Sequence, residues 1–137
     1  SFRENMRYVN QYWESNLGIK MYQTDGSGLS RSNAFSANHY IELLKFMYKS
    51  KNFEVFDASL PVAGESGTLR SMARGQAAQG KLKAKSGSLN RVRAFSGYVD
   101  SKSGDKIAFS IIVNNYDLST AQLNKEIEKI FNAMANW

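Results

Sequence analysis

The chain of 137 residues contains no cysteine, one proline and one histidine. Without cysteine it can form no disulfide, zinc–thiolate cluster or catalytic thiolate, although this absence does not identify a compartment. The single histidine, His39, has no histidine partner for a metal or a triad, so we interpret it as a first-turn helix residue and predict no metal site. No apolar run approaches the roughly 18 residues that cross a bilayer, and the first residues lack a signal-peptide core. We therefore expect no transmembrane segment in this chain.

Composition and charge favour a globular protein that does not bind nucleic acid. Apolar residues make up 42% of the sequence and aromatic residues 12%, so one folded unit over residues 1–137 is expected. The formal net charge is +6, but the basic residues are dispersed and no nucleic-acid-binding motif accompanies them. Only the stretch from Lys81 to Arg93 is denser. It either attracts an anionic ligand or guards a strand edge with lysines.

Two helices are predicted in the first part of the chain. Apolar residues recur at steps of three and four over Phe2–Leu17, and Gly18 is a stop signal. A second helix follows Ser36, a plausible N-cap, and ends near Ser50. The aromatic and methionine side chains of these helices are interpreted as core residues.

The second half predicts strands followed by a final helix. Val92–Asp100 and Lys106–Asn115 are rich in β-branched and aromatic residues, and the polar turn between them predicts an antiparallel hairpin. The strand that carries Lys85 is expected to pair beside this hairpin. Ser119 and Gln122 form a capping box, after which apolar residues line one face of a helix.

The segment Ala63–Gly80 contains four glycines and no clear periodicity, which predicts a loop-rich stretch that folds over the site described next. No internal repeat or domain boundary is evident. Three strands and three helices in this order indicate an α/β protein of the α+β type, with an antiparallel sheet and flanking helices.

The run Lys85-Ser86-Gly87-Ser88 is the strongest functional signal in the sequence. A Lys-Ser-Gly triplet on a strand places an ammonium, a hydroxyl and a backbone without a side chain next to one another. This set of groups suits a ligand that carries a carboxylate and a carbonyl. Alone, a tripeptide of this kind is more often a solvated turn.

Two other segments accompany the triplet. Asp25–Arg31 reads DGSGLSR, and Leu60–Leu69 reads LPVAGESGTL. Together with AKSGSL at Ala84–Leu89, these segments resemble the serine D-alanyl-D-alanine carboxypeptidases of the class C low-molecular-mass penicillin-binding proteins, in order and in spacing. The resemblance covers about Tyr22–Asn115. It implies the C-terminal part of a penicillin-binding protein or β-lactamase-like transpeptidase domain.

Two elements of that family are missing from credible positions. Its Ser-x-x-Lys nucleophile matches only Ser103–Lys106, a polar stretch that is better explained as a hairpin turn. Its Ser-x-Asn element matches at Ser36, Ser50 and Ser88, and none of these leads into the expected helix. We therefore expect a C-terminal part of a larger enzyme, whose nucleophile lies upstream.

The resemblance implies roles for the four residues of the strand. Lys85 would orient the catalytic groups and supply positive charge. Ser86, where the family more often has threonine, would donate a hydrogen bond to the terminal carboxylate of the substrate. Gly87 would let the substrate backbone lie flat against the strand, and the N–H of Ser88 would form half of an oxyanion hole.

A pocket for the substrate side chain is also implied by the resemblance, formed by Leu29, Arg31, Leu89 and Asn90. Arg31 could hold the carboxylate of a meso-diaminopimelate side chain in a bidentate fork. It could equally be a structural arginine that clamps its own loop. Asp25 is interpreted as a turn residue that bonds its own backbone, in preference to a catalytic acid.

The function implied is serine-type carboxypeptidase or endopeptidase chemistry on peptidoglycan stem peptides, through an acyl-enzyme and without a cofactor. β-Lactams would inhibit the parent protein, and its location would be the periplasm or cell envelope of a bacterium. The fragment alone would be inactive. The alternative is a non-catalytic module that binds peptidoglycan peptides and lacks a nucleophile.

Overall fold

Three antiparallel strands form the sheet of this computed structural model, which describes residues 2–137 and side chains from Glu4 onward. The strands are β1 (Leu82–Leu89), β2 (Val92–Asp100) and β3 (Lys106–Asn114), in the order β1-β2-β3. The predicted hairpin is confirmed, with β3 one residue shorter than expected. The strand of Lys85 pairs beside it, as predicted.

Gly97 sets the close approach of β1 and β2. It lies opposite Ala84 in the register. A Cβ atom at this glycine would stand 2.0 Å from the carbonyl oxygen of Lys83 and 2.7 Å from Cα of Ala84. Because such distances are far below van der Waals contact, only glycine fits here without displacing the strand that carries Lys85.

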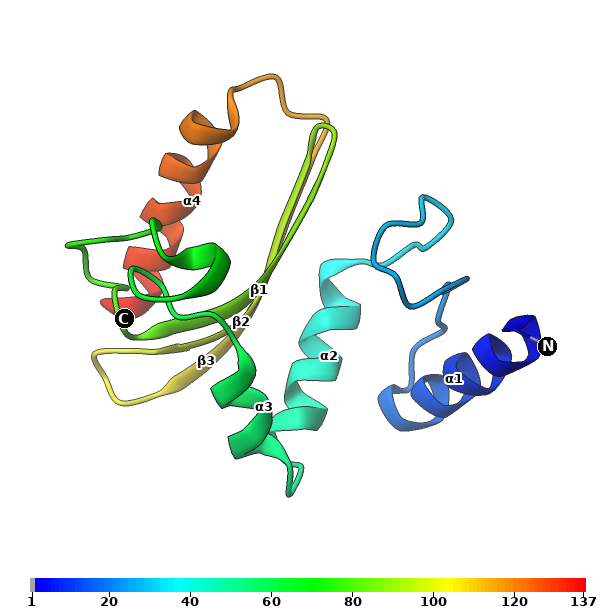
Figure 1. Ribbon diagram of the computed structural model, residues 1–137. Helices are drawn as coiled ribbons and strands as arrows, with labels where there is room; N and C mark the ends of the chain where they lie inside the picture. The colour runs from blue at the N-terminus through cyan, green and yellow to red at the C-terminus, as the bar shows by residue number, and fades with distance from the viewer. Residues whose placement is uncertain (1) are drawn as a thin grey trace.

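Helices cover both faces of the sheet (Figure 1). Helix α4 (Thr120–Ala135) lies on one face, and α2 (Ala37–Tyr48) and α3 (Phe53–Ser59) lie on the other. The larger core lies on the α4 side and is built from buried side chains of the sheet, of α4 and of the segment before β1, among them Leu69, Leu82, Phe95, Val99, Ile127 and Phe131. The smaller core joins Leu44, Leu60 and Tyr98 on the opposite face.

The helix ends follow the sequence signals. Helix α1 (Phe2–Leu17) is followed by Gly18 in a left-handed conformation with φ of 69°. Ser36 and Ser119 cap α2 and α4, and the capping box of Ser119 with Gln122 is confirmed.

Helix α3 was not predicted, because a helix of seven residues is too short to show periodicity. Its Phe53 and Phe56 pack edge to face against Tyr98 of β2. The element is therefore held by tertiary contacts more than by a local signal.

The segment 63–80 is loop-rich, as predicted, and contains one 3₁₀ turn, η1 (Gly67–Leu69). Its apolar residues Leu69, Met72, Ala73 and Ala78 are buried in the larger core. This stretch is part of the packed core, because burial of its apolar side chains holds it against β1 and α4. That the segment also folds over the site stays a prediction.

Helix α1 lies outside α2 and away from the sheet (Figure 1). Met6, Trp13 and Leu17 of its predicted apolar stripe are half-buried, but Val9 of the same stripe is 38% exposed. Tyr8 and Tyr12 are 65% and 55% exposed. The side chain of Phe2, which completes the stripe, lies outside the described residues. Within the described part of the chain, no helix is long and apolar enough to cross a membrane.

Candidate active site

Lys85 and Gly87 share one face of β1, the face that α2 and α3 cover further along the strand. Side chains alternate along a strand, and Lys83, two residues before Lys85, pairs with Tyr98 of the smaller core. Lys85 is exposed, and its ammonium donates a hydrogen bond of 2.5 Å to the carbonyl oxygen of Ser86. The ammonium thus folds back over the edge of its own strand.

Ser86 faces the opposite side and is only 8% exposed. Its hydroxyl donates a hydrogen bond of 2.8 Å to Oγ1 of Thr68 in η1. Thr68 belongs to the LPVAGESGTL segment, but no role was predicted for it. The segment before β1 thus reaches the Lys-Ser-Gly strand through one pair of hydroxyl groups.

The outer edge of β1 is covered at its start and open beyond. Ala63 N–H donates to the Leu82 carbonyl oxygen at 2.8 Å, and Ala84 N–H donates to the Pro61 carbonyl oxygen at 3.0 Å. Because these groups point outward, the N–H groups of Ser86 and Ser88 point to the same edge. No described strand pairs with that edge. It can therefore receive an extended ligand by adding a strand.

Gly87 is a glycine that the fold does not require. A Cβ atom built on it would lie 3.5 Å from Cβ of Ala94, which is ordinary contact, and its φ is not in the left-handed region. Gly97, by contrast, has no room for a Cβ atom. The absence of a side chain at Gly87 therefore leaves free space on the exposed face of the strand.

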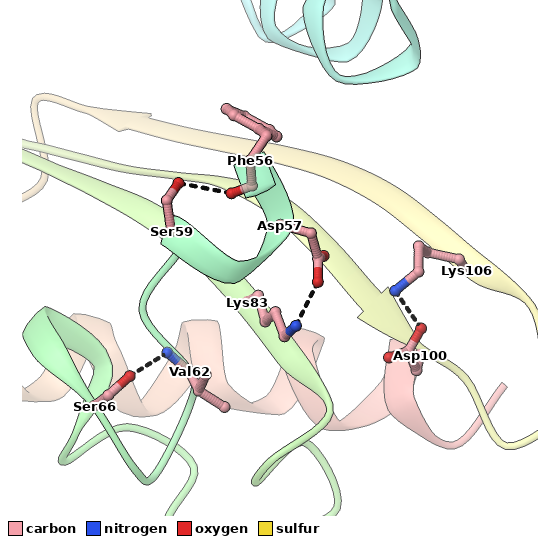
Figure 2. A network of polar contacts seen from close by, with 8 residues as sticks. All are labelled: Phe56, Asp57, Ser59, Val62, Ser66, Lys83, Asp100 and Lys106. Carbon is pink, nitrogen blue, oxygen red and sulfur yellow. Dashed lines mark hydrogen bonds and ion pairs between the residues drawn. The ribbon is translucent and has the colours of Figure 1, made fainter. Parts of the chain in front are cut away.

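An ion pair neutralises the lysine next to Lys85. Figure 2 shows Asp57 of α3 pointing toward the ammonium of Lys83, with which it forms a partly buried ion pair. Lys85 has no carboxylate partner among the described residues. Of the two lysines on this face of β1, only Lys85 has a charge that no carboxylate within the described chain balances.

Tyr98 packs under this ion pair. Its hydroxyl donates a hydrogen bond of 2.7 Å to the carbonyl oxygen of Leu44. Burial, and secondly the nearby carboxylate of Asp57, raise the pKa of Tyr98 to about 12. This tyrosine therefore stays neutral and ties α2 to the sheet at neutral pH.

The predicted pocket residues lie in two places. Leu89 and Asn90 are at the end of β1, where both are exposed. Leu29 and Arg31 are on the loop 22–34, which an isolated bridge between Tyr22 and Ala34 closes. No hydrogen bond or ion pair among the described residues joins this loop to β1. That these four residues form one pocket therefore stays a prediction.

Asp25 is a turn residue, as the sequence predicted. Its Oδ1 accepts hydrogen bonds from the hydroxyl of Ser27 at 2.9 Å, from the N–H of Ser27 at 3.1 Å and from Nδ2 of Asn33 at 3.1 Å. The bond from the Ser27 side chain, followed by those from Asn33 and the Ser27 backbone, lowers the pKa of Asp25 below its usual value. The carboxylate stays ionised and holds its own loop.

Arg31 does not clamp its loop. Its side chain is exposed and makes no hydrogen bond or ion pair within the described chain. Leu29 is 71% exposed. The side chain that does clamp the loop is that of Asn33, for which no role was predicted. Only its position two residues after Arg31, next to a turn-forming run, could have drawn attention to it.

A cavity of about 280 Å³ lies behind the loop, between α1 and α2. Trp13, Phe35 and Tyr40 supply its aromatic wall, and Asp25 and Asn33 its polar rim. Trp13 and Tyr40 were predicted as core, and no role was predicted for Phe35. None of the residues from Lys85 to Ser88 lines this cavity, so it is separate from the strand.

The remaining sequence matches have structural roles. His39 is a first-turn residue of α2, as predicted. Its Nδ1 accepts the N–H of Ser36 at 3.1 Å and its Nε2 lies 2.9 Å from the Lys20 carbonyl oxygen, so it also caps this turn. Ser103 lies in the turn between β2 and β3 and bonds Asp105 at 2.7 Å, as expected for a hairpin turn. In the described part of the chain, no cluster of acidic residues and histidine is placed to hold a metal ion.

Comparison with known proteins gives consistent matches over the whole chain. Residues 1–137 match the D-Ala-D-Ala carboxypeptidase 3 (S13) family. The chain is 42% identical over 110 residues, 74% of its length, to a D-alanyl-D-alanine carboxypeptidase of Actinomadura sp. strain R39. It is 30% identical over 138 residues, 95% of its length, to penicillin-sensitive carboxypeptidase A of Dictyostelium discoideum.

The fold is also similar to that of a solved structure. Penicillin binding protein 4 of Haemophilus influenzae, solved in complex with a β-lactam, superposes with a TM-score of 0.84 at 25% identity. The match covers 100% of this chain and 34% of that protein. The chain spans 20% and 26% of the length of the two curated relatives.

Proposed function

Because the chain belongs to the D-Ala-D-Ala carboxypeptidase 3 (S13) family, we propose that it is the C-terminal part of a serine-type D-Ala-D-Ala carboxypeptidase or endopeptidase. The observation that carries the proposal is the unbalanced ammonium of Lys85 beside an open strand edge, to which the N–H of Ser88 points. Below, "the full-length protein" means this chain together with the upstream sequence.

The proposed reaction cleaves the peptide bond between the two terminal D-alanines of a peptidoglycan stem peptide. An upstream serine oxygen bonds to the carbonyl carbon, the C–N bond breaks, and the terminal D-alanine leaves with a proton on its amine. Water then hydrolyses the ester and regenerates the serine. An endopeptidase would cut a D-amino-acid cross-link by the same steps.

The strand would hold the substrate in line for this attack. The ammonium of Lys85 attracts the terminal carboxylate, and the outward N–H of Ser88 donates to the oxyanion together with the N–H of the upstream nucleophile. The hydroxyl of Ser86 donates to Thr68 in the free structure. Each of the two hydroxyl groups can donate or accept a hydrogen bond. If the Thr68 hydroxyl donates to Ser86 instead, the hydroxyl proton of Ser86 becomes available to the substrate carboxylate.

The pocket residues would recognise the side chain of the preceding diamino acid. Arg31 has no partner within the described chain, so its guanidinium is available to a carboxylate such as that of meso-diaminopimelate. Leu29, Leu89 and Asn90 are exposed and would contact the aliphatic chain and its amine. Substrate binding would have to bring the loop 22–34 and β1 to the same ligand.

β-Lactams would acylate the same serine, and the similar Haemophilus protein has been solved with a β-lactam bound. Because peptidoglycan lies outside the cytoplasmic membrane, the proposed location is extracytoplasmic.

One observation favours a second candidate, a peptide-binding module without catalysis. The only Ser-x-x-Lys of the chain is in the turn between β2 and β3, where Ser103 and Asp105 bond each other. If no nucleophile precedes the chain, the strand would bind D-Ala-D-Ala peptides without cutting them.

Release of D-alanine from a peptide that ends in D-Ala-D-Ala tests the proposal. The full-length protein should release it, and Lys85→Ala should lower kcat/KM at least about 100-fold, because the charge at the carboxylate is lost. Lys102→Ala, which removes an exposed lysine in the β2–β3 turn, is the matched control and should keep full activity. Peptide binding without D-alanine release would favour the binding module and contradict the enzyme.

A further inference from the structure

The side chain of Asn33 clamps the neck of the loop that carries Leu29 and Arg31, while Asp25 bonds within the turn. Oδ1 of Asn33 accepts from the N–H of Thr24 at 2.7 Å, from the hydroxyl of Thr24 at 2.9 Å and from the N–H of Asp25 at 3.3 Å. Its Nδ2 donates to the carbonyl oxygen of Asp25 at 3.2 Å and to Oδ1 of Asp25 at 3.1 Å. Every polar atom of the amide is used, and all five bonds cross the neck of the loop.

The orientation of this amide is fixed by its partners. A backbone N–H can only donate, so the atom that faces Thr24 N and Asp25 N must be the oxygen. The nitrogen then faces the carbonyl and carboxylate of Asp25, which can only accept. An amide matches this arrangement of donors and acceptors, and a carboxylate in its ionised form does not.

The loop contributes little to the folded core. None of the residues from Thr24 to Asn33 is buried, and the neck is also closed by the Ala34 N–H, which donates to the Tyr22 carbonyl oxygen at 2.9 Å. Loss of the Asn33 amide should therefore loosen the loop without unfolding the molecule. The loss would instead change the positions of the exposed side chains of Leu29 and Arg31.

From this geometry we infer that Asn33 is a positioning residue that sets the preference of the enzyme for a substrate side chain ending in a carboxylate. The inference rests on the proposed function, in which Arg31 binds that carboxylate. Asn33 does not touch the ligand. It holds the loop in its binding conformation before the ligand arrives. The entropy cost of ordering the loop therefore does not weaken the affinity for the substrate carboxylate.

The readout is a preference ratio, measured on the full-length protein with two peptides that end in D-Ala-D-Ala. One carries meso-diaminopimelate before the D-alanines and the other carries norleucine, which lacks the terminal carboxylate and amine. The ratio of their kcat/KM values isolates side-chain recognition from the chemical step. Penicillin carries no diamino-acid side chain, so its acylation of the enzyme reports on the catalytic machinery alone.

Asn33→Ala should lower the preference ratio about tenfold, through KM for the diaminopimelate peptide, with the norleucine peptide and penicillin acylation unchanged. Combined with Arg31→Ala, it should cause no further loss of the ratio, because the two residues act on the same contact. Asn16→Ala is the matched control. It removes an exposed amide that bonds the Tyr12 carbonyl oxygen on α1, and it should leave the ratio unchanged.

Asn33→Asp adds a second test that does not depend on truncation. The ionised carboxylate that this substitution introduces would repel Asp25, so the ratio should fall at neutral pH. Two adjacent carboxylates share a proton more readily as pH falls, and the introduced carboxyl group, once protonated, would again donate to Asp25. The ratio should therefore recover toward the wild-type value near about pH 5, a change that a purely steric defect would not show.

The possible failures are distinguishable. A wild-type protein that is acylated by penicillin but does not prefer the diaminopimelate peptide would contradict the proposed Arg31 pocket. A preference that survives Asn33→Ala would overturn the role of Asn33 alone. Equal losses on both peptides and on penicillin acylation would show that Asn33 supports the fold and not the preference.

Discussion

At the residue scale, the two glycines of the β1–β2 pair have opposite meanings. Gly97 is required by packing, because a Cβ atom there would overlap the backbone of β1. Gly87 is not required, because a Cβ atom there would meet only Ala94 at ordinary contact distance. Gly87 lies on an exposed strand face beside Lys85, and we propose that its place is kept free for a ligand that lies against the strand.

Gly87→Ala therefore separates function from folding. The free energy of unfolding should change by less than about 0.5 kcal/mol, because the new methyl group fits. Penicillin acylation of the full-length protein should slow at least about tenfold, because the methyl group displaces the ligand from the strand. Urea unfolding and acylation kinetics measure the two effects. Acylation of Gly87→Ala at the wild-type rate would contradict a ligand-contacting role for Gly87. Gly97→Ala, by contrast, should lower the free energy of unfolding strongly, because its Cβ atom would overlap β1.

At the element scale, the strands and the capped helices were predictable because their signals are local. The hairpin strands, the stop at Gly18 and the capping box of Ser119 were all found in the sequence. Helix α3 was not, since its seven residues are fixed by packing of Phe53 and Phe56 on a distant strand. The buried course of the segment 63–80 escaped for the same reason, because its turns carry no periodic pattern.

In the candidate site, too, local signals were predicted from the sequence and contacts between distant residues were not. The Lys-Ser-Gly strand was legible as a short motif, and the exposure of Arg31 favours one of the two roles left open for it. The partners that the structure adds, Thr68 for Ser86 and Asp57 for Lys83, lie 18 and 26 residues away in sequence. Contacts between such distant residues form only in the assembled sheet, so no local pattern in the sequence predicts them.

The contact between α2 and the sheet should respond to alkaline pH. The pKa of Tyr98 is raised from 10.0 to about 12, so its stabilising effect is complete below pH 10 and is lost as pH rises toward 12. Tyr98→Phe should cost about 1 kcal/mol at pH 7 through the lost hydrogen bond to Leu44.

This difference between wild type and Tyr98→Phe should shrink between pH 10 and about 12, as urea unfolding over that range would show. A difference that stays constant with pH would contradict the shifted pKa.

At the scale of the whole molecule, we propose that the chain presents one wall of a site. The open edge of β1 has no described strand beside it, and the tyrosines of α1 are exposed on the outside. The proposed nucleophile would have to come from upstream sequence that faces Lys85.

Labelling with a fluorescent penicillin tests this account most directly. The full-length protein, this chain alone, and full-length Lys85→Ala would be compared in one assay. We predict a covalent label on the full-length protein, none on the chain alone, and at most about one hundredth of the wild-type acylation rate for Lys85→Ala. An unlabelled full-length protein, or a labelled isolated chain, would contradict the claim that this chain is one wall of a serine acyl-enzyme site.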